Sequence, residues 1–388
     1  MAEMGENVPA YRMIKVAGPE GPVEAVADVE AWQARTAYPD LLGLGGPVFG
    51  VARECETGGW EMLDSFAGLA PQDSRDDMGA HLRGQGRRVG EAGDAAGRAQ
   101  CMEAAERLEW EALNELTVLG VRYRVVRAER FIRSGPEGPE PPRPSDPDPA
   151  EVGESRHVAD KPAVGFIIDP ALPTAAAQGA LKIELLSLLC KTGAVPDDVR
   201  DDLVHASHTH PGGVLLPATF MTAERTAGRW MPGSIGVEAT PQEARDGLAM
   251  SLRVMIPWRL GLSEEEKAPY TAAADRLDAT RANELNVVGR HFRVVRVERL
   301  VRIGPDGPEG PRPSDHDPQP PVMVQKGTPS APGANSGTEG DGEDATRADH
   351  HGGNADDAPI ELDEDAQRLH DLMLAEVARH KAARRDKS

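Results

Sequence analysis

The sequence is poor in aromatic residues, in cysteine and in positive charge. Aromatic side chains make up 4% of the 388 residues and hydrophobic residues 39%, so any core must be largely aliphatic. The three cysteines, Cys55, Cys101 and Cys190, are odd in number and far apart, which argues against a disulfide scaffold and favours a reducing compartment. A formal net charge of -21 argues against a protein that binds nucleic-acid phosphates over a large surface.

Long apolar runs and a leader pattern are also missing. No stretch approaches the roughly 18 apolar residues of a membrane span. Residues 1–7 lack the basic and then apolar run that is typical of a signal peptide. We therefore expect a cytoplasmic protein with no membrane span.

The patterns of common catalytic sites are absent as well. The chain has no GxSxG nucleophile elbow, no GxxxxGK[ST] phosphate loop and no HExxH zinc motif. The sequence therefore predicts no cofactor, and it leaves enzyme activity undecided.

What the sequence does contain is an internal duplication. Residues 114–149 and 283–318 align without a gap at an offset of 169, and 24 of 36 positions are identical. A weaker match continues upstream at an offset of 170, where Pro71 and Arg75 correspond to Pro241 and Arg245. A repeat of this length is a domain, because solenoid units have periods of about 20 to 50 residues. The sequence predicts two homologous domains that pack as a pseudo-twofold pair.

The spacing of apolar residues predicts the elements of each domain. In the first copy we expect strands over residues 11–16 and 122–132, a hairpin from 48–53 and 60–63, and helices over 23–37 and 98–117. Gly120 and its counterpart Gly289 suit a left-handed cap at the end of the second helix. The predicted fold class is α+β, with two tandem homologous domains, each a small sheet with helices on one face.

Composition places the boundaries between these parts. The first repeat is predicted to cover residues 1–134 and the second 161–303, with a Pro/Gly-rich linker at 135–160. Residues 304–359 are Pro/Gly-rich and then acidic, with too few large apolar residues to pack, so we expect a disordered linker. Residues 360–386 are predicted to form a C-terminal amphipathic helix.

Arginines recur at every third residue in both copies of the repeated segment. The spacing runs through Arg127, Arg130 and Arg133 and through Arg296, Arg299 and Arg302. The candidate surface selected from this segment consists of Arg124, Arg127, Arg130, Arg293, Arg296 and Arg299. This spacing would suit a helix, but the β-branched residues around it favour a strand, in which Arg127 and Glu129 share one face and can pair. Two interpretations remain open: salt bridges over a sheet, or an anion-binding or partner surface that is present twice.

Three histidines form the pattern closest to a metal site. His205, His208 and His210 lie within six residues, and neutral imidazole is a good ligand for zinc. The His-Thr-His-Pro stretch is similar to the zinc-binding segment of JAB/MPN-type metalloproteases, but Ala218 and Met221 stand where that family has its serine and aspartate. At an offset of 170 the first copy has Arg35, Tyr38 and Asp40 instead, so any site would belong to one copy. The alternative is a set of solvated loop histidines.

The predicted C-terminal helix has one apolar face. Leu362, Leu369, Met373 and Val377 lie on that face, with acidic residues in the first turn and basic residues at the end. The face can dock on the body of the same chain, on an unknown protein partner or on a second copy. A membrane surface is the least favoured alternative, because the polar face has mixed charge.

Three stretches together resemble a family of uncharacterised proteins from high-GC actinobacteria. They are GGPVFGVARE, APQDSRDDMGAHLR and RVVRAERFIRSGPEGPEPPRPSDPDP, and the resemblance covers residues 8–318. It implies a bacterial cytoplasmic origin and brings no activity, cofactor or catalytic residue with it. The first functional hypothesis is therefore a non-enzymatic interaction or ligand-binding protein, and the alternative is a metal-dependent enzyme with one active copy at the histidines.

Overall fold

Two long strands run through the middle of the molecule. The computed structural model describes residues 9–153, 163–188, 195–233, 236–327 and 364–385. Strand β5 (Val121–Gly135) pairs antiparallel with β11 (Arg290–Gly304), and Arg130 lies directly opposite Arg299. Within the described ranges these two strands join 12 strands in one sheet, so the sheet runs without a break from one half of the chain to the other.

The first half of the chain, residues 9–153, supplies one side of this sheet. Its elements are α1 (Pro22–Ala37), β1 (Asp40–Gly43), β2 (Val48–Glu54), β3 (Trp60–Met62), α2 (Pro71–Glu91), α3 (Ala95–Trp110), β4 (Glu115–Val118), β5 and β6 (Gly138–Pro139). Strands β1, β2, β4 and β6 all pair antiparallel with β5.

The second half, residues 163–327, supplies the other side. Its elements are β7 (Ile167–Ile168), α4 (Ala176–Ser187), α5 (Asp197–Thr209), β8 (Gly212–Thr226), β9 (Arg229–Pro232), α6 (Pro241–Met250), the π-helix η3 (Ser251–Met255), α7 (Ile256–Arg259), α8 (Glu264–Thr280), β10 (Glu284–Val287), β11, β12 (Gly307–Pro308) and α9 (Val322–Gly327). Helix α10 (Glu364–Arg385) follows. The sheet order is β7-β3-β2-β5-β11-β8-β9.

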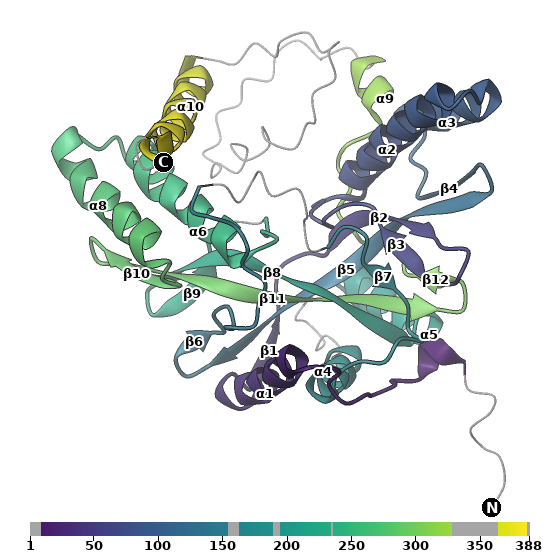
Figure 1. Ribbon diagram of the computed structural model, residues 1–388, viewed down its shortest axis with the longest axis horizontal. Helices are drawn as coiled ribbons and strands as arrows, with labels where there is room; N and C mark the ends of the chain where they lie inside the picture. Colours follow the sequence, from purple (N-terminus) through teal and green to yellow (C-terminus); the bar gives the residue numbers. More distant parts are fainter. Residues whose placement is uncertain (1–8, 154–162, 189–194, 234–235, 328–363, 386–388) are drawn as a thin grey trace, which may run out of the picture.

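The α+β class is confirmed, but the arrangement within it differs from the expectation. We predicted two small sheets with helices on one face of each. Instead, Figure 1 shows α2 and α3 over one end of a single curled sheet and α6 and α8 over the other, with α1 and α4 on the opposite face. One core cluster joins Val48, Trp60 and Met62 of the first half to Val214 and Val301 of the second. The two halves therefore share a core.

Local turn geometry explains where the predicted helix over 98–117 was wrong. Helix α3 ends at Trp110, and residues 115–118 form β4, which pairs with β5. Leu119 and Gly120 both have positive φ angles, 52° and 78°, as do Val288 and Gly289. Two consecutive residues with positive φ form the tight hairpin turn that matches strand twist. Gly120 and Gly289 are thus hairpin residues, not helix caps.

The amino-terminal segment also differs from its prediction. Residues 11–16 were expected to form a strand, but Ala10–Arg12 is a short 3₁₀ helix and Val16 makes one isolated bridge with Thr174. The predicted helix over 23–37 is confirmed as α1, and the predicted hairpin is confirmed as β2 and β3.

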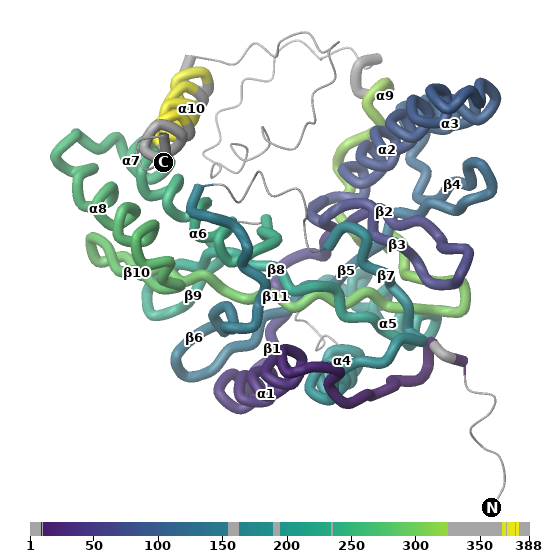
Figure 2. The backbone as a smooth tube through the Cα atoms, in the orientation of Figure 1, coloured from purple at the N-terminus to yellow at the C-terminus, as the bar shows by residue number. Residues whose placement is uncertain are grey.

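The segments expected to be linkers are packed. Figure 2 shows β6 beside β9 and β10 of the second half. Figure 1 shows β12 beside β3 and β4 of the first half. Glu140 and Glu309, which follow these two short strands, are only 2% and 5% exposed. We call residues 136–149 and 305–318 the arms. Prolines keep the arms extended, and their carboxylates pair with buried arginines of the opposite half, which gives them an order that composition did not predict. Residues 154–162 and 328–359 lie outside the described residues.

We predict that the arm contacts contribute strongly to stability. Arg127 Nε donates one bifurcated hydrogen bond to the two carboxylate oxygens of Asp315, each at 3.0 Å, and the Asp315 and Arg127 side chains are 4% and 7% exposed. Replacing Asp315 with alanine leaves a buried guanidinium without this partner, so the free energy of unfolding should fall by about 3 kcal/mol, as measured by urea denaturation. Glu111→Ala breaks the exposed pair with Arg107 and should lower the stability far less, because solvent screens this pair. Equal losses in the two variants would contradict this account.

Candidate functional site

The six arginines singled out from the sequence lie inside the molecule. Arg124, Arg127, Arg130, Arg293 and Arg299 are between 0% and 8% exposed, and the Arg296 side chain is 11% exposed. Arg130 Nε donates to the Gly46 carbonyl at 3.0 Å, and Arg299 donates to the carbonyls of Pro217, Ser65 and Phe66. This placement differs from an exposed anion-binding or partner surface and agrees with the alternative of ion pairs over a sheet.

Arg124 is held between a ring of its own half and the arm of the other half. Its guanidinium lies 4.8 Å from the centre of the Trp60 ring and donates to the Pro308 carbonyl at 2.9 Å. Gly307 has a φ of +109°, and a Cβ there would lie 2.6 Å from the Trp60 indole nitrogen, so only glycine fits. In the other copy, the same arrangement is made by Arg293, Trp230, Pro139 and Gly138.

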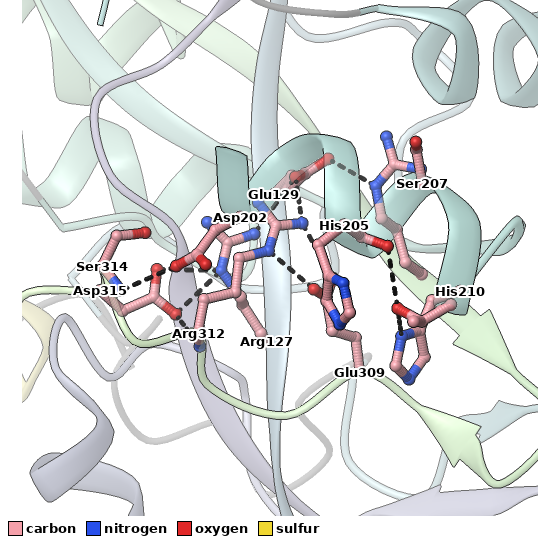
Figure 3. Close-up of polar contacts among 12 residues, drawn as sticks. Arg127, Glu129, Asp202, His205, Ser207, His210, Glu309, Arg312, Ser314 and Asp315 are labelled. Atoms are coloured by element: carbon pink, nitrogen blue, oxygen red, sulfur yellow. Dashed lines mark hydrogen bonds and ion pairs between the residues drawn. The ribbon is translucent and has the colours of Figure 1, made fainter. Parts of the chain in front are cut away.

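A buried ionic cluster lies beneath α5. We call it the α5 cluster, and it consists of Arg127, Glu129, Arg302, Glu309, Arg312 and Asp315. Arg312 bonds Glu309 at 2.7 Å and Glu129 at 2.8 Å, which ties the arm to β5. Figure 3 shows Arg127 and Arg312 between Asp315 and Glu129, with His205 and His210 to one side. Two halves of the chain thus build one charged site.

The counterpart cluster lies on the side of α1 and α4. We call it the α1 cluster, and each of its members matches a member of the α5 cluster in the gap-free alignment of the two copies. It consists of Arg133, Glu140, Arg143, Asp146, Arg296 and Glu298. Arg296 bonds Asp146 at 3.0 Å, and Arg143 bonds Glu140 at 2.6 Å. Its four ion pairs repeat pairs of the α5 cluster, but the pair of Arg302 with Glu129 has no counterpart between Arg133 and Glu298 among the described residues.

The two clusters differ at one arginine. Arg133 donates from Nη2 to Glu184 of α4 at 2.9 Å, although its Nη1 has no hydrogen bond. Its counterpart Arg302 has a fully buried side chain, and Nε, Nη1 and Nη2 all lack a hydrogen-bond partner. The nearest paired carboxylate is Glu129, 3.5 Å from Nε. Within the described part of the chain, no other arginine has all three guanidinium nitrogens buried and unbonded.

The charges of each cluster shift the pKa of its central glutamate. Burial would raise the pKa of Glu129, but Arg302, Arg127 and Arg312 together hold it below its usual value. The pKa of Glu298 is lowered in the same way, because Arg296, Arg143 and Arg133 outweigh the effect of burial. Both carboxylates are therefore anions at neutral pH and neutralise the arginines around them.

The histidines lie at the carboxyl end of α5, not in a loop. His208 Nδ1 lies 2.7 Å from the Val204 carbonyl, and His210 Nδ1 lies 3.0 Å from the Thr209 hydroxyl. Burial lowers the pKa of His210. Among the residues that the structure describes, no group of three or more potential ligands is close enough to hold a metal ion. The structure therefore does not bring His205, His208 and His210 together as a ligand set.

The ends of α1 and α5 also correct the sequence alignment. Tyr38 caps α1 with φ −125° and ψ 70°, and His210 caps α5 with φ −127° and ψ 67°. A proline follows each of them. His210 therefore corresponds to Tyr38, at an offset of 172 rather than 170.

The structure has two hollows, one beside Arg299 and one beside the start of β8. A cavity of about 30 Å³ is lined by both halves and includes Arg299, Ser65 and the unbonded Thr219 hydroxyl. A larger open groove of about 310 Å³ lies between the amino-terminal segment, α4 and the start of β8; its lining residues are Tyr11, Arg12, Ile14, Ile183, Leu186, Ser187, Pro211, Gly212 and Gly213. The smaller cavity has room for little more than water, whereas the groove falls at the lower limit of small-molecule sites.

The C-terminal helix docks on its own chain. Leu369 is 6% exposed, and the Glu376 carboxylate lies 3.4 Å from Arg253 of the π-helix. Met373 is partly buried, while Leu372 and Leu374 are exposed. Leu362 and the side chain of Val377, the other members of the predicted apolar face, lie outside the described residues.

Sequence reasoning missed four of the six residues in each cluster. The arm residues Glu140, Arg143 and Asp146 were assigned to a linker, and Arg133 and Arg302 were not selected. A signal was available, because charged residues of the arms recur at the same offset as the arginines of the strands. Acidic side chains retained among prolines in both copies indicate partners, and the partners proved to be in the opposite half.

We predict an unusual pH response from Asp64. Its carboxylate accepts hydrogen bonds of 2.7 Å from the Val51 and Phe66 amides, and its burial raises the pKa to about 7. The neutral acid is thus favoured in the fold, so the stability it contributes is complete below about pH 4 and is lost as the pH rises through 7.

Asp64→Asn removes this titration. The variant should gain about 2 kcal/mol relative to wild type between pH 5 and pH 8 in urea denaturation, a value below the full linkage because one edge of Asp64 reaches solvent. Asp76→Asn, on the partly exposed surface of α2, is the matched control and should show no such gain. A flat difference between wild type and Asp64→Asn over that range would contradict the assignment.

Comparison with known proteins identifies a family for this chain, but that family has no assigned activity. No helix in the described ranges combines the length and the apolar character that crossing a membrane requires. No curated protein and no solved structure matches the chain. A family model described as a family of unknown function, DUF5954, matches residues 21–318, the region that holds both halves of the sheet, both arms and both ionic clusters. The chain belongs to the DUF5954 family of unknown function.

Proposed function

We propose that the protein is a non-enzymatic ligand-binding protein built from two copies of one unit around a pseudo-twofold axis. The axis would pass between Arg130 and Arg299, which lie opposite one another in the central strand pair. The proposed ligand is a small anion that binds Arg302 in the α5 cluster. The unbonded guanidinium of Arg302 is the observation that carries this proposal.

The repeated contacts support the two-unit architecture. Arg127 with Asp315 and Arg296 with Asp146 are the same pair in the two copies, each joining a strand to the arm of the other half. Arg75 bonds Asp317 at 2.6 Å and Asn114 at 2.9 Å, and Arg245 bonds Asp148 and Asn283 in the same way. Contacts that occur in both copies are explained by their role in holding the two halves together. A ligand site is therefore expected where the two halves differ.

Arg302 is the cluster residue whose hydrogen bonding differs from that of its counterpart Arg133. Arg302 forms an ion pair with Glu129 at 3.5 Å, but none of its guanidinium nitrogens has a hydrogen bond. Buried donors without a hydrogen bond are costly, and the five N–H groups of a guanidinium suit an oxyanion. Binding is favoured over catalysis because the other ionic groups of the cluster are already paired with one another. An anion at Arg302 would supply the hydrogen-bond acceptors that its guanidinium lacks.

Thermal unfolding in the presence of small anions tests this function. At constant ionic strength, sodium formate should raise the melting temperature above its value in sodium chloride, since a ligand at 100 times its Kd adds about 2.7 kcal/mol. Arg302→Met should abolish the formate effect. The matched control is Arg133→Met, the counterpart position, which should keep the effect even if the variant is less stable. Equal formate stabilisation of wild type and Arg302→Met would contradict the proposal.

A further inference from the structure

We infer that the ligand is a small aliphatic carboxylate whose carboxylate bonds Arg302 and whose hydrocarbon body lies in the groove beside Gly213. This inference rests on the proposed function and adds the chemical class of the ligand and the position of its second part. Three features carry it: the partner of the counterpart arginine, the lining of the groove, and the pairing of β8 with β11.

The first half shows which group satisfies this arginine. Arg133 occupies the position that Arg302 has in the second half, and it bonds the carboxylate of Glu184, a residue of α4. Glu184 also bonds Arg35 of α1 at 2.6 Å, so its carboxylate joins two helices to the sheet. A carboxylate from a ligand would give Arg302 the bond that Glu184 gives Arg133.

The groove suits a hydrocarbon chain. Ile14, Ile183 and Leu186 line it together with Tyr11 and Pro211, and Ile183 is 60% exposed. An exposed isoleucine in a hollow of about 310 Å³ offers apolar area that a ligand can cover. Arg12, also at the groove, adds positive charge and disfavours a cationic ligand.

The pairing of β8 with β11 places the groove and Arg302 on one face of the sheet. Gly213 lines the groove and lies directly opposite Arg302 in the strand register. Residues directly opposite one another in an antiparallel pair project to the same face. A Cβ on Gly213 would lie 2.9 Å from Leu300 and 3.1 Å from Leu186, so that face is the one covered by α4. Gly213 lines the groove directly across the strand pair from Arg302, and Leu186 and Leu300 pack over it.

Titration with a series of carboxylates tests the inference on the full chain. Acetate, butanoate and hexanoate are titrated by calorimetry, with 1-hexanol, hexanamide and inorganic phosphate as comparisons. Affinity for the carboxylates should rise up to about fourfold per methylene, which corresponds to about 0.8 kcal/mol per buried CH₂ group. Hexanol and hexanamide should bind at least tenfold more weakly than hexanoate, because neither brings an anion to Arg302.

Variants separate the two parts of the site. Ile183→Ser should reduce the affinity ratio of hexanoate to acetate at least fivefold, compared within the same variant. Val23→Ser, an exposed apolar position on α1 outside the groove, is the control and should leave both affinities unchanged. Because both positions are exposed, loss of the fold does not confuse the comparison.

The outcomes distinguish this inference from the function on which it rests. If acetate and hexanoate bind equally and Ile183→Ser has no effect, the groove is not part of the site and the inference fails, although Arg302-dependent anion binding stands. Tighter binding of phosphate than of hexanoate would also overturn the carboxylate assignment. If no anion binds in an Arg302-dependent manner, the proposed function itself fails.

Discussion

Buried guanidinium groups that find their carboxylates in the other half of the chain determine this fold. Arg127 and Arg296 lie on the central strands, where water cannot solvate them, and each needs an acid that its own half does not supply in full. Asp315 and Asp146 supply it from the arms. The need to neutralise these arginines holds two proline-rich segments against the sheet that a purely apolar sheet would leave in solvent.

Such pairs fix geometry more than they add stability. Replacing a buried ion pair with apolar residues is often neutral, whereas removing one partner is costly. The arms also have a defined geometry. Their prolines restrict the backbone to an extended conformation, and their acidic residues are spaced so that each contacts an arginine on β5 or β11. Gly138 and Gly307 add a steric requirement, since the Trp230 and Trp60 rings occupy the space where a side chain would be. Register between the halves is thereby set by charge and by shape together.

Much of the local structure follows from the sequence, and the long-range arrangement does not. The β-branched residues from Val294 to Ile303 correctly indicated a strand despite arginines at helical spacing, and the pairing of Arg127 with Glu129 followed from strand alternation. The helix over 98–117 was extended too far, because Leu113 and Leu116 continued its apolar stripe into what is a hairpin. The helix ends at Trp110, where Glu111 takes an extended conformation, and the turn at Leu119 and Gly120 then joins β4 to β5.

The site was harder to predict for a physical reason. Periodicity reports which residues share a face, but it carries no information on which half an arm contacts or that Arg130 meets Arg299 across one sheet. The small shifts in offset between the copies also hid the match of Tyr38 with His210, which only the cap geometry reveals. The difference between Arg133 and Arg302 depends on Glu184 of α4, for which the alignment gave no counterpart.

The crossing of the arms has a consequence for how the chain acquires its shape during synthesis. Arg75 cannot form its ion pair until Asp317 has been synthesised, 242 residues later. Arg127 likewise requires Asp315, which is synthesised 188 residues after it. Contacts this distant in sequence slow folding and expose partly formed strands in the meantime. The amino-terminal half can therefore complete its charged interior only after nearly the whole sheet has been translated, so the two halves must mature together rather than one after the other.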